Sequence, residues 1–157
     1  MGYILQPLLK IRLMREDRAS GELTAARQKR EAAEETLAAR KKDLAAYEET
    51  REERRDRIYA TIIGQTVSRD RLDIASEGVA RIDEEGVLKA DNVKRAESEL
   101  NEKLKQEVEA RRLYNLATKE RMKIDEHRSI WLAEEAAAQE LRAEGELEDF
   151  VGRKLEV

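Results

Sequence analysis

The chain has 157 residues, of which 42% are charged and only 4% aromatic, and its formal net charge is −4. A globular core of this size uses more large apolar residues, so we expect no core with a full shell around it. Interleaved acidic and basic residues leave no broad basic face for a nucleic-acid backbone. The absence of cysteine excludes disulfides, thiolate zinc sites and cysteine nucleophiles.

The N-terminal segment YILQPLLKIRLM is apolar, but it does not predict a signal peptide. Pro7, Lys10 and Arg12 interrupt it, and no small-residue cleavage site follows. No apolar run elsewhere reaches the roughly 20 residues that span a bilayer. We therefore expect a cytoplasmic protein.

The first helix is predicted from about residue 7 to residue 63. Pro7 suits its first turn, where a missing N–H costs nothing. Within it, LTAARQKREAAEETLAARKKDLAAY (residues 23–47) places apolar residues at alternating spacings of three and four. Such a seam needs a partner helix, and its sustained period argues against disorder, the competing interpretation of so much charge.

The seam of this helix can be written as two heptad positions. The a-type positions are Leu9, Glu16, Leu23, Arg30, Leu37, Leu44, Arg51 and Ile58. The d-type positions are Arg12, Ala19, Ala26, Ala33, Arg40, Tyr47, Arg54 and Thr61. The arginine stems can cover the seam while their heads reach water. The core is therefore weak, which a two-helix contact tolerates and the centre of a four-helix bundle does not.

The segment 64–86 is predicted to be a connector, because it holds three of the seven glycines. We expect a turn over 64–68, a short helix over about 69–77 and a second turn at Gly78. The pattern between Gly78 and Gly86 is ambiguous.

The second helix is predicted from about residue 88 to residue 149, followed by a tail over 150–157 in which Gly152 is a stop signal. Its predicted seam consists of Val93, Ala96, Leu100, Leu104, Ala110, Tyr114, Ala117, Ile124, Trp131, Ala138 and Leu141.

The two predicted helices have similar lengths, so the economical partner of the first is the second. The sequence thus predicts an all-α fold, a single-domain antiparallel two-helix coiled-coil hairpin over residues 1–157, monomeric in isolation. A basic start (Lys10, Arg12, Arg15 and Arg18) would lie beside an acidic end, whereas a parallel dimer would place like charges together. This acidic end contains Glu134, Glu135, Glu140, Glu144, Glu146, Glu148 and Asp149.

A fold-back centred near Ala75 would place Trp131 opposite Gly21. A glycine inside a helix costs about 1 kcal/mol relative to alanine, and room for an indole would compensate. The residues expected to pack the hairpin are Gly21, Leu23, Leu37, Leu44, Tyr47, Leu100, Tyr114 and Trp131.

The sequence offers no convergent chemistry, and we expect no catalytic, cofactor or metal site. His127 is the only histidine, and on a charged helix it is expected to be solvated or at the seam edge. The glycines lack the spacing and the following Lys-Ser/Thr of a phosphate loop.

Three features in order resemble a known family. The chain opens with YILQPLLKIRLMREDRA, closes with HRSIWLAEEAAAQELRAEGELEDF, and has two charge-rich helices between them. This is similar to the YscO stalk family of bacterial type III secretion, whose flagellar counterpart is FliJ.

The resemblance implies a non-enzymatic stalk that inserts into the pore of the hexameric secretion ATPase, promotes its assembly or activity, and links it to the cytoplasmic ring of the export gate. The protein would then be peripheral to the inner membrane. Some family members also bind the needle-length regulator or escort chaperones.

The resemblance also assigns regions to partners. The end with both termini would contact the ATPase through Leu8, Ile11, Arg12, Arg15, Arg18, Glu146, Glu148, Asp149 and Phe150. The middle segment would face the export gate through Leu72, Ile74, Val79 and Ile82. These four residues could instead cap the hydrophobic end of the hairpin, and the Arg12–Arg18 stretch could be only a solvated helix start.

Two alternatives stay open at this point. One is a flagellar FliJ-type export stalk or chaperone-escort protein. The other is a coiled-coil scaffold or chaperone unrelated to secretion.

Overall fold

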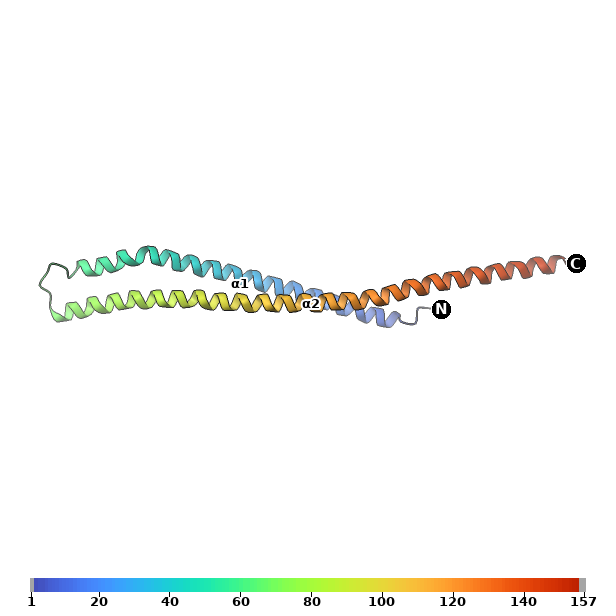
Figure 1. The fold of residues 1–157 in the computed structure, drawn as a ribbon, viewed down its shortest axis with the longest axis horizontal. Coiled ribbons are helices and arrows are strands. Elements are labelled where there is room, and N and C mark those ends of the chain that lie inside the picture. Colours follow the sequence, from blue (N-terminus) through green and yellow to red (C-terminus); the bar gives the residue numbers. More distant parts are fainter. Residues whose placement is uncertain (1, 156–157) are drawn as a thin grey trace. The chain divides into compact units, whose positions relative to one another are not determined.

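The structure is a computed structural model that describes residues 2–155, with side chains through residue 152. It consists of helices α1 (Gln6–Ala60) and α2 (Arg69–Leu155), with no strand among the described residues. The helices pack against each other as an all-α hairpin (Figure 1), which confirms the predicted fold class.

The contacts divide the chain into two compact units. The terminal unit comprises Met1–Leu23 and Ala110–Val157, and the connector unit comprises Thr24–Glu109. Each unit pairs a stretch of α1 with an antiparallel stretch of α2: Arg12 meets Glu120 in the first, and Arg51 meets Asp83 in the second. The expectation of a single domain stays a prediction, and each unit is described by itself.

The ends of α1 agree with the sequence to within a few residues. Pro7 lies in the first turn, and the Gln6 amide donates to the Tyr3 carbonyl at 3.1 Å just before it. At the other end the Thr61 amide donates to the Ile58 carbonyl, and Gly64 adopts a φ of 76°, which suits a residue without a Cβ. The predicted break at Gly64 is confirmed.

The connector is shorter than predicted. It covers residues 61–68, and α2 then runs from Arg69 through Gly78 and Gly86 without a break. The Ser68 hydroxyl caps the start of α2 by accepting from the Arg71 amide at 3.4 Å. A connector over 64–86, a separate short helix over 69–77 and a helix beginning near residue 88 are therefore wrong.

Gly78 and Gly86 lie within the helix because large side chains of α1 occupy the space beside them. A Cβ on Gly86 would lie 3.1 Å from Cε1 of Tyr47, and one on Gly78 would lie 3.1 Å from Cδ1 of Ile58. The Tyr47 side chain is buried, and its hydroxyl donates to the Ile82 carbonyl. These glycines are thus packing positions rather than turns.

The seam of α1 follows the predicted heptads closely. Every a-type position is buried or half-buried, and so is every d-type position except Arg40 and Thr61. Leu9, Leu23 and Tyr47 are among the most buried side chains in the structure.

On α2 the predicted seam is partly wrong. Ala75, Ile82, Val93 and Ala96 are buried. The half-buried predicted members are Leu100, Ala110, Tyr114, Ala117, Ile124, Trp131 and Ala138. Leu104 and Leu141, however, are 40% and 69% exposed. At Leu104 the reason is local, because the neighbouring Lys103 and Glu107 take the seam positions instead.

Trp131 does not pack against Gly21. A fold-back at residues 61–68, rather than near Ala75, places Trp131 beside Tyr3, with ring centroids 5.4 Å apart. No atom of the facing helix lies within 4 Å of a Cβ built on Gly21. The predicted pairing is therefore wrong, and the cause is the misplaced turn.

Because the chain turns back at residues 61–68 rather than near Ala75, α2 extends beyond the start of α1. Every residue from 139 to 152 is exposed, and Figure 1 shows α2 continuing past the start of α1. We call residues 139–152 the overhang. Helix α2 also passes Gly152 and ends at Leu155, so the predicted end near residue 149 is wrong. Residues 156–157 of the predicted tail lie outside the described part of the chain.

The acidic end of α2 consequently does not lie beside the basic start of α1. Arg12 pairs with Glu120 instead, and Arg18 pairs with Glu22 one turn along its own helix. The predicted juxtaposition of opposite charges is wrong, although an antiparallel pairing is observed.

Two glycine substitutions test the packing role of Gly86. We expect Gly21→Ala to raise the free energy of unfolding by about 0.5–1 kcal/mol, since it gains helix propensity in open space. Gly86→Ala gains the same propensity but must displace the buried Tyr47 ring, a cost of about 1–3 kcal/mol, so we expect a net change at or below zero. Urea unfolding followed by circular dichroism measures both, and equal stabilisation would contradict this account.

Candidate interaction surfaces

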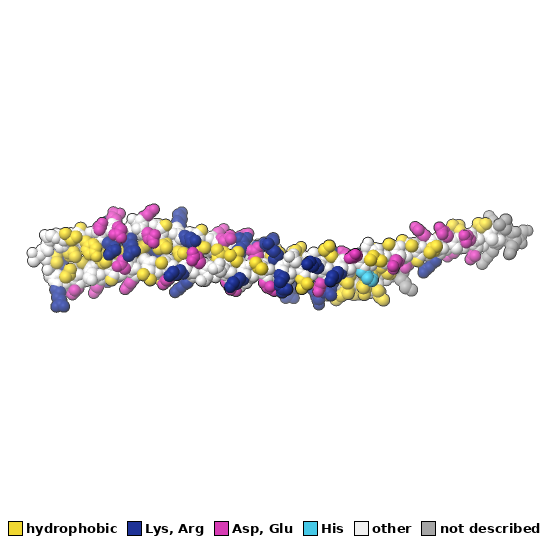
Figure 2. Space-filling model, in the orientation of Figure 1, with side chains coloured by type: hydrophobic (Ala, Val, Ile, Leu, Met, Phe, Trp, Pro, Cys, Tyr) yellow, Lys and Arg dark blue, Asp and Glu magenta, His cyan; other side chains and the backbone are white. Residues whose placement is uncertain are grey.

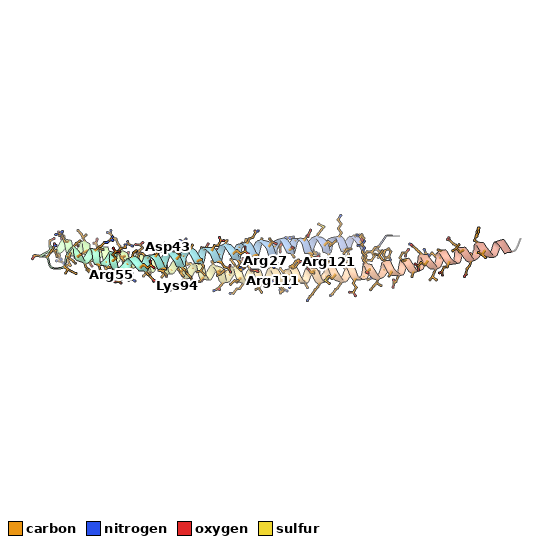
Figure 3. All side chains as sticks on the ribbon, turned by 90° about the horizontal axis from the view of Figure 1, so that it is seen from above. Arg27, Asp43, Arg55, Lys94, Arg111 and Arg121 are labelled. Atoms are coloured by element: carbon orange, nitrogen blue, oxygen red, sulfur yellow. The ribbon has the colours of Figure 1, made fainter. Side chains whose placement is uncertain are left out.

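The contact between α1 and α2 in the connector unit includes an ion-pair network at its seam. Glu107 is the one buried charged residue among those described. Its carboxylate accepts from Nε of Arg30 at 2.5 Å, and Arg27 lies 3.8 Å away. Hydrogen bonds to Glu34 and Glu107 raise the pKa of Arg30. Arg27 of this network is labelled in Figure 3.

The terminal unit has a second such network. Glu16, an a-type residue, accepts from Nε of Arg121 at 2.5 Å and from the Thr118 hydroxyl at 3.1 Å. Arg121, labelled in Figure 3, also pairs with Asp125 at 2.9 Å. The hydrogen bond from Arg121 lowers the pKa of Glu16, against the opposing effect of burial. These seam charges are thus paired across the helices rather than merely reaching water.

Tyr47 is the centre of a third group of contacts. Arg54 and Lys89 lie over its ring, at 5.5 Å and 5.8 Å from the centroid. Arg54 also pairs with Glu85 at 3.0 Å, and Lys89 pairs with Asp43 at 2.9 Å. Both cations thus connect α1 to α2 around one aromatic side chain.

An aromatic cluster fixes the segment before α1. Tyr3 is 8% exposed, its hydroxyl lies 2.8 Å from Nδ1 of His127, and its ring packs on Trp131. His127 therefore lies at the edge of the helix contact, one of the two environments expected for it. The role of Tyr3 was not predicted from the sequence, although an aromatic residue shortly before a helix-initiating proline was a usable signal.

The structure separates the residues expected at the ATPase end into two groups. On α1, Leu8 and Arg12 are half-buried, whereas Ile11, Arg15 and Arg18 are exposed. On α2, Glu146, Glu148, Asp149 and Phe150 are all exposed and lie in the overhang. Ile4 and Met14, 83% and 64% exposed, add apolar surface near the first group that the sequence analysis missed.

The residues expected to face the export gate also divide. Leu72 and Ile74 are 51% and 68% exposed, Val79 is half-buried, and Ile82 is 5% exposed within the seam. Tyr59, near the end of α1, and Ile63, within the connector, are further exposed side chains. We call Tyr59, Ile63, Leu72 and Ile74 the connector patch.

Two shallow hollows accompany this patch. One of about 540 Å³ is lined by Ile58, Ile62 and Ile74 among others, and one of about 420 Å³ by Tyr59, Leu72 and Val79 among others. Leu72 and Ile74 therefore lie on opposite flanks of α2, and each borders its own recess.

The residues expected to pack the hairpin mostly face the partner helix. Leu23 and Tyr47 are buried, and Gly21 is exposed. The half-buried members of the set are Leu37, Leu44, Leu100, Tyr114 and Trp131.

Within residues 2–155 no group of three or more His, Asp or Glu side chains is arranged to hold a metal ion. Over the same residues, neither helix has a stretch that is long and apolar enough to cross a membrane. The exposed surface of these residues includes apolar and charged side chains.

Comparison with known proteins decides the family. The family described as type III secretion protein YscO matches residues 5–153. The chain belongs to the YscO family. None of the curated proteins compared with the chain matches it.

A solved structure shares the fold. CT670 of Chlamydia trachomatis, a proposed YscO homologue, superposes with a TM-score of 0.72 at 21% sequence identity. The similarity covers 99% of this chain and 94% of that one. The same two-helix fold thus forms from a largely different sequence.

Substitution of Glu16 tests the terminal network through its pH dependence. Because the folded pKa of Glu16 is lowered, its stabilising effect is present above its ordinary pKa of 4.5 and is lost as the pH falls through the folded value. We expect Glu16→Gln to lower stability at pH 7, and its deficit relative to the native chain to shrink below about pH 4.5.

Glu22→Gln is the matched control, since Glu22 pairs with Arg18 in an exposed contact. Urea unfolding at several pH values from 3 to 7 measures all three proteins. A deficit for Glu16→Gln that stays constant with pH would contradict the assigned network.

Proposed function

We propose that this YscO-family chain is the non-enzymatic central stalk of a bacterial type III secretion ATPase complex. In this role it inserts into the pore of the hexameric ATPase, promotes its assembly or activity, and links it to the cytoplasmic ring of the export gate. The observation that carries the proposal is the family match over residues 5–153. That match also argues against a coiled-coil scaffold unrelated to secretion.

The terminal unit supports contact with the ATPase. Ile11, Arg15 and Arg18 expose one mixed apolar and basic surface, and the overhang exposes a second, acidic one. Arg12 is less suited to contact a partner, because its ion pair with Glu120 already engages its side chain. We therefore assign the ATPase contact to the exposed members of the expected set.

The connector unit supports contact with the export gate. Leu72 and Ile74 are available to a partner on two flanks of α2, and Tyr59 and Ile63 are further exposed side chains near the connector. Ile82 is committed to the seam, where its carbonyl accepts from Tyr47. A cytoplasmic site peripheral to the inner membrane follows from these two partners. The needle-length regulator and secretion chaperones would reach the side faces left exposed by a two-helix contact.

The direct experiment is to add the purified chain to its cognate secretion ATPase and to measure ATP hydrolysis and hexamer formation. We expect both to increase. A purified chain that neither binds nor stimulates the ATPase would overturn the stalk role.

Substitution within the connector patch tests the second contact. We expect Ile74→Ser to weaken binding to the cytoplasmic domain of the export gate about tenfold, as loss of one central apolar contact does. Stimulation of the ATPase should stay unchanged. Val108→Ser is the control, because Val108 is 70% exposed in the same unit, against 68% for Ile74. Equal effects of the two variants on gate binding would contradict the assigned patch.

A further inference from the structure

An apolar stripe begins in the last turns of the helix contact, before the overhang, and continues along the overhang. At 3.6 residues per turn, its members fall within about 60° of arc. They are Leu132, Ala136, Ala143, Leu147 and Phe150. Leu132, Leu147 and Phe150 are 50%, 64% and 62% exposed. We call this set the overhang stripe.

This stripe is not the unused continuation of the seam that faces α1. Seam spacing continued beyond Ala138 falls on Arg142, Gly145 and Asp149, none of which is apolar. The overhang stripe lies roughly 130° around the helix from that line. Its apolar side chains are therefore placed for something other than a longer α1.

The charges beside the stripe indicate what it would bind. Glu140 and Glu144 border it on one side, and Glu135 and Glu146 border it on the other. Arg142 is the single basic residue over positions 134–149. Figure 2 shows magenta carboxylates among yellow side chains along this part of α2. Because the flanks are acidic, the complementary surface is an apolar one with Lys or Arg at its borders.

A hollow marks the start of the stripe. It measures about 560 Å³, and Tyr3, Gln6 and Trp131 line one part of it while Leu132 and Ala136 line another. The first two residues of the stripe thus form the wall of a recess where the N-terminal segment meets α2. An apolar side chain of a partner could enter there.

We propose that the overhang stripe binds a basic amphipathic helix of the secretion ATPase on one face of α2. This rests on the proposed function and specifies how one of its contacts is made. The occupant lays its apolar face on Leu132, Leu147 and Phe150 and directs its basic flanks to the glutamates. Such a partner contacts one face of α2. The alternative is a partner that surrounds the helix and contacts all of its faces equally.

Two leucines of the overhang distinguish these arrangements. Leu147 lies in the stripe, and Leu141 lies about 150° away from its centre. They are 64% and 69% exposed, so neither supports the fold through burial. We expect Leu147→Ser to weaken binding to the cognate ATPase about tenfold and Leu141→Ser to change it less than twofold, measured by isothermal titration calorimetry. Circular dichroism checks that both variants keep their helix content.

Charge reversal tests the basic character of the occupant. We expect Glu140→Lys combined with Glu144→Lys to weaken ATPase binding at least tenfold, and the native affinity to fall as the salt concentration rises. Equal losses for Leu141→Ser and Leu147→Ser, or an affinity that is insensitive to salt and to charge reversal, would overturn this inference while leaving the stalk role intact. A native chain that does not bind the ATPase would overturn both.

Discussion

The antiparallel register of α1 on α2 is the constraint on which the rest of the structure depends. Two helices with alanine-rich seams can shift in register at little cost, because one small residue replaces another at each position. Glu107 and Tyr47 prevent such a shift of α1 along α2. A shift would leave the carboxylate of Glu107 away from Arg30 in a nearly buried position, and uncompensated buried charge is strongly destabilising. The same shift would drive the Tyr47 ring into a side chain larger than Gly86. Burial of small apolar side chains alone would allow several registers of α1 on α2. The charge of Glu107 and the shape of Tyr47 select one of them, as polar seam residues do in coiled coils.

Register and helix length together determine what is exposed in each unit. In the terminal unit, Tyr3 meets His127 and Trp131, so the described residues before and within α1 cover α2 only up to about Gln139. The exposure of the overhang is therefore a consequence of where the chain turns back. In the connector unit, the turn at residues 61–68 leaves Ile63 in the connector and Leu72 near the start of α2 with too few neighbours to bury them. Both candidate surfaces thus lie near helix ends, where the described residues of one helix have no residues of the other helix facing them.

Much of this fold could be predicted from the sequence, because heptad periodicity is a local signal that the partner helix must respect. The a and d positions of α1 follow it almost throughout. The wrong predictions concern residues whose structural role depends on which side chain of the other helix faces them. Gly78 and Gly86 suggest turns by their conformational freedom, but their small size is what matters beside Ile58 and Tyr47. Because the predicted turn was in the wrong place, the predicted partners of Trp131 and of the acidic end of α2 were wrong as well. For the candidate surfaces, residue type identified Ile74 and Phe150, but only the register could separate them from the buried Ile82.

The orientation of the overhang stripe bears on how a partner could bind without undoing the hairpin. Had the exposed apolar residues continued the seam line, a competing helix could have entered along it and displaced α1 from its end, with loss of the Tyr3 contacts. Ala138 is the last half-buried residue of that line, and none of the next positions along it carries an apolar side chain. A partner on the stripe approaches from a different side of α2 and meets the N-terminal segment only at the recess near Leu132. Helix α2 can therefore hold α1 and a partner at the same time, on different sides of one continuous helix.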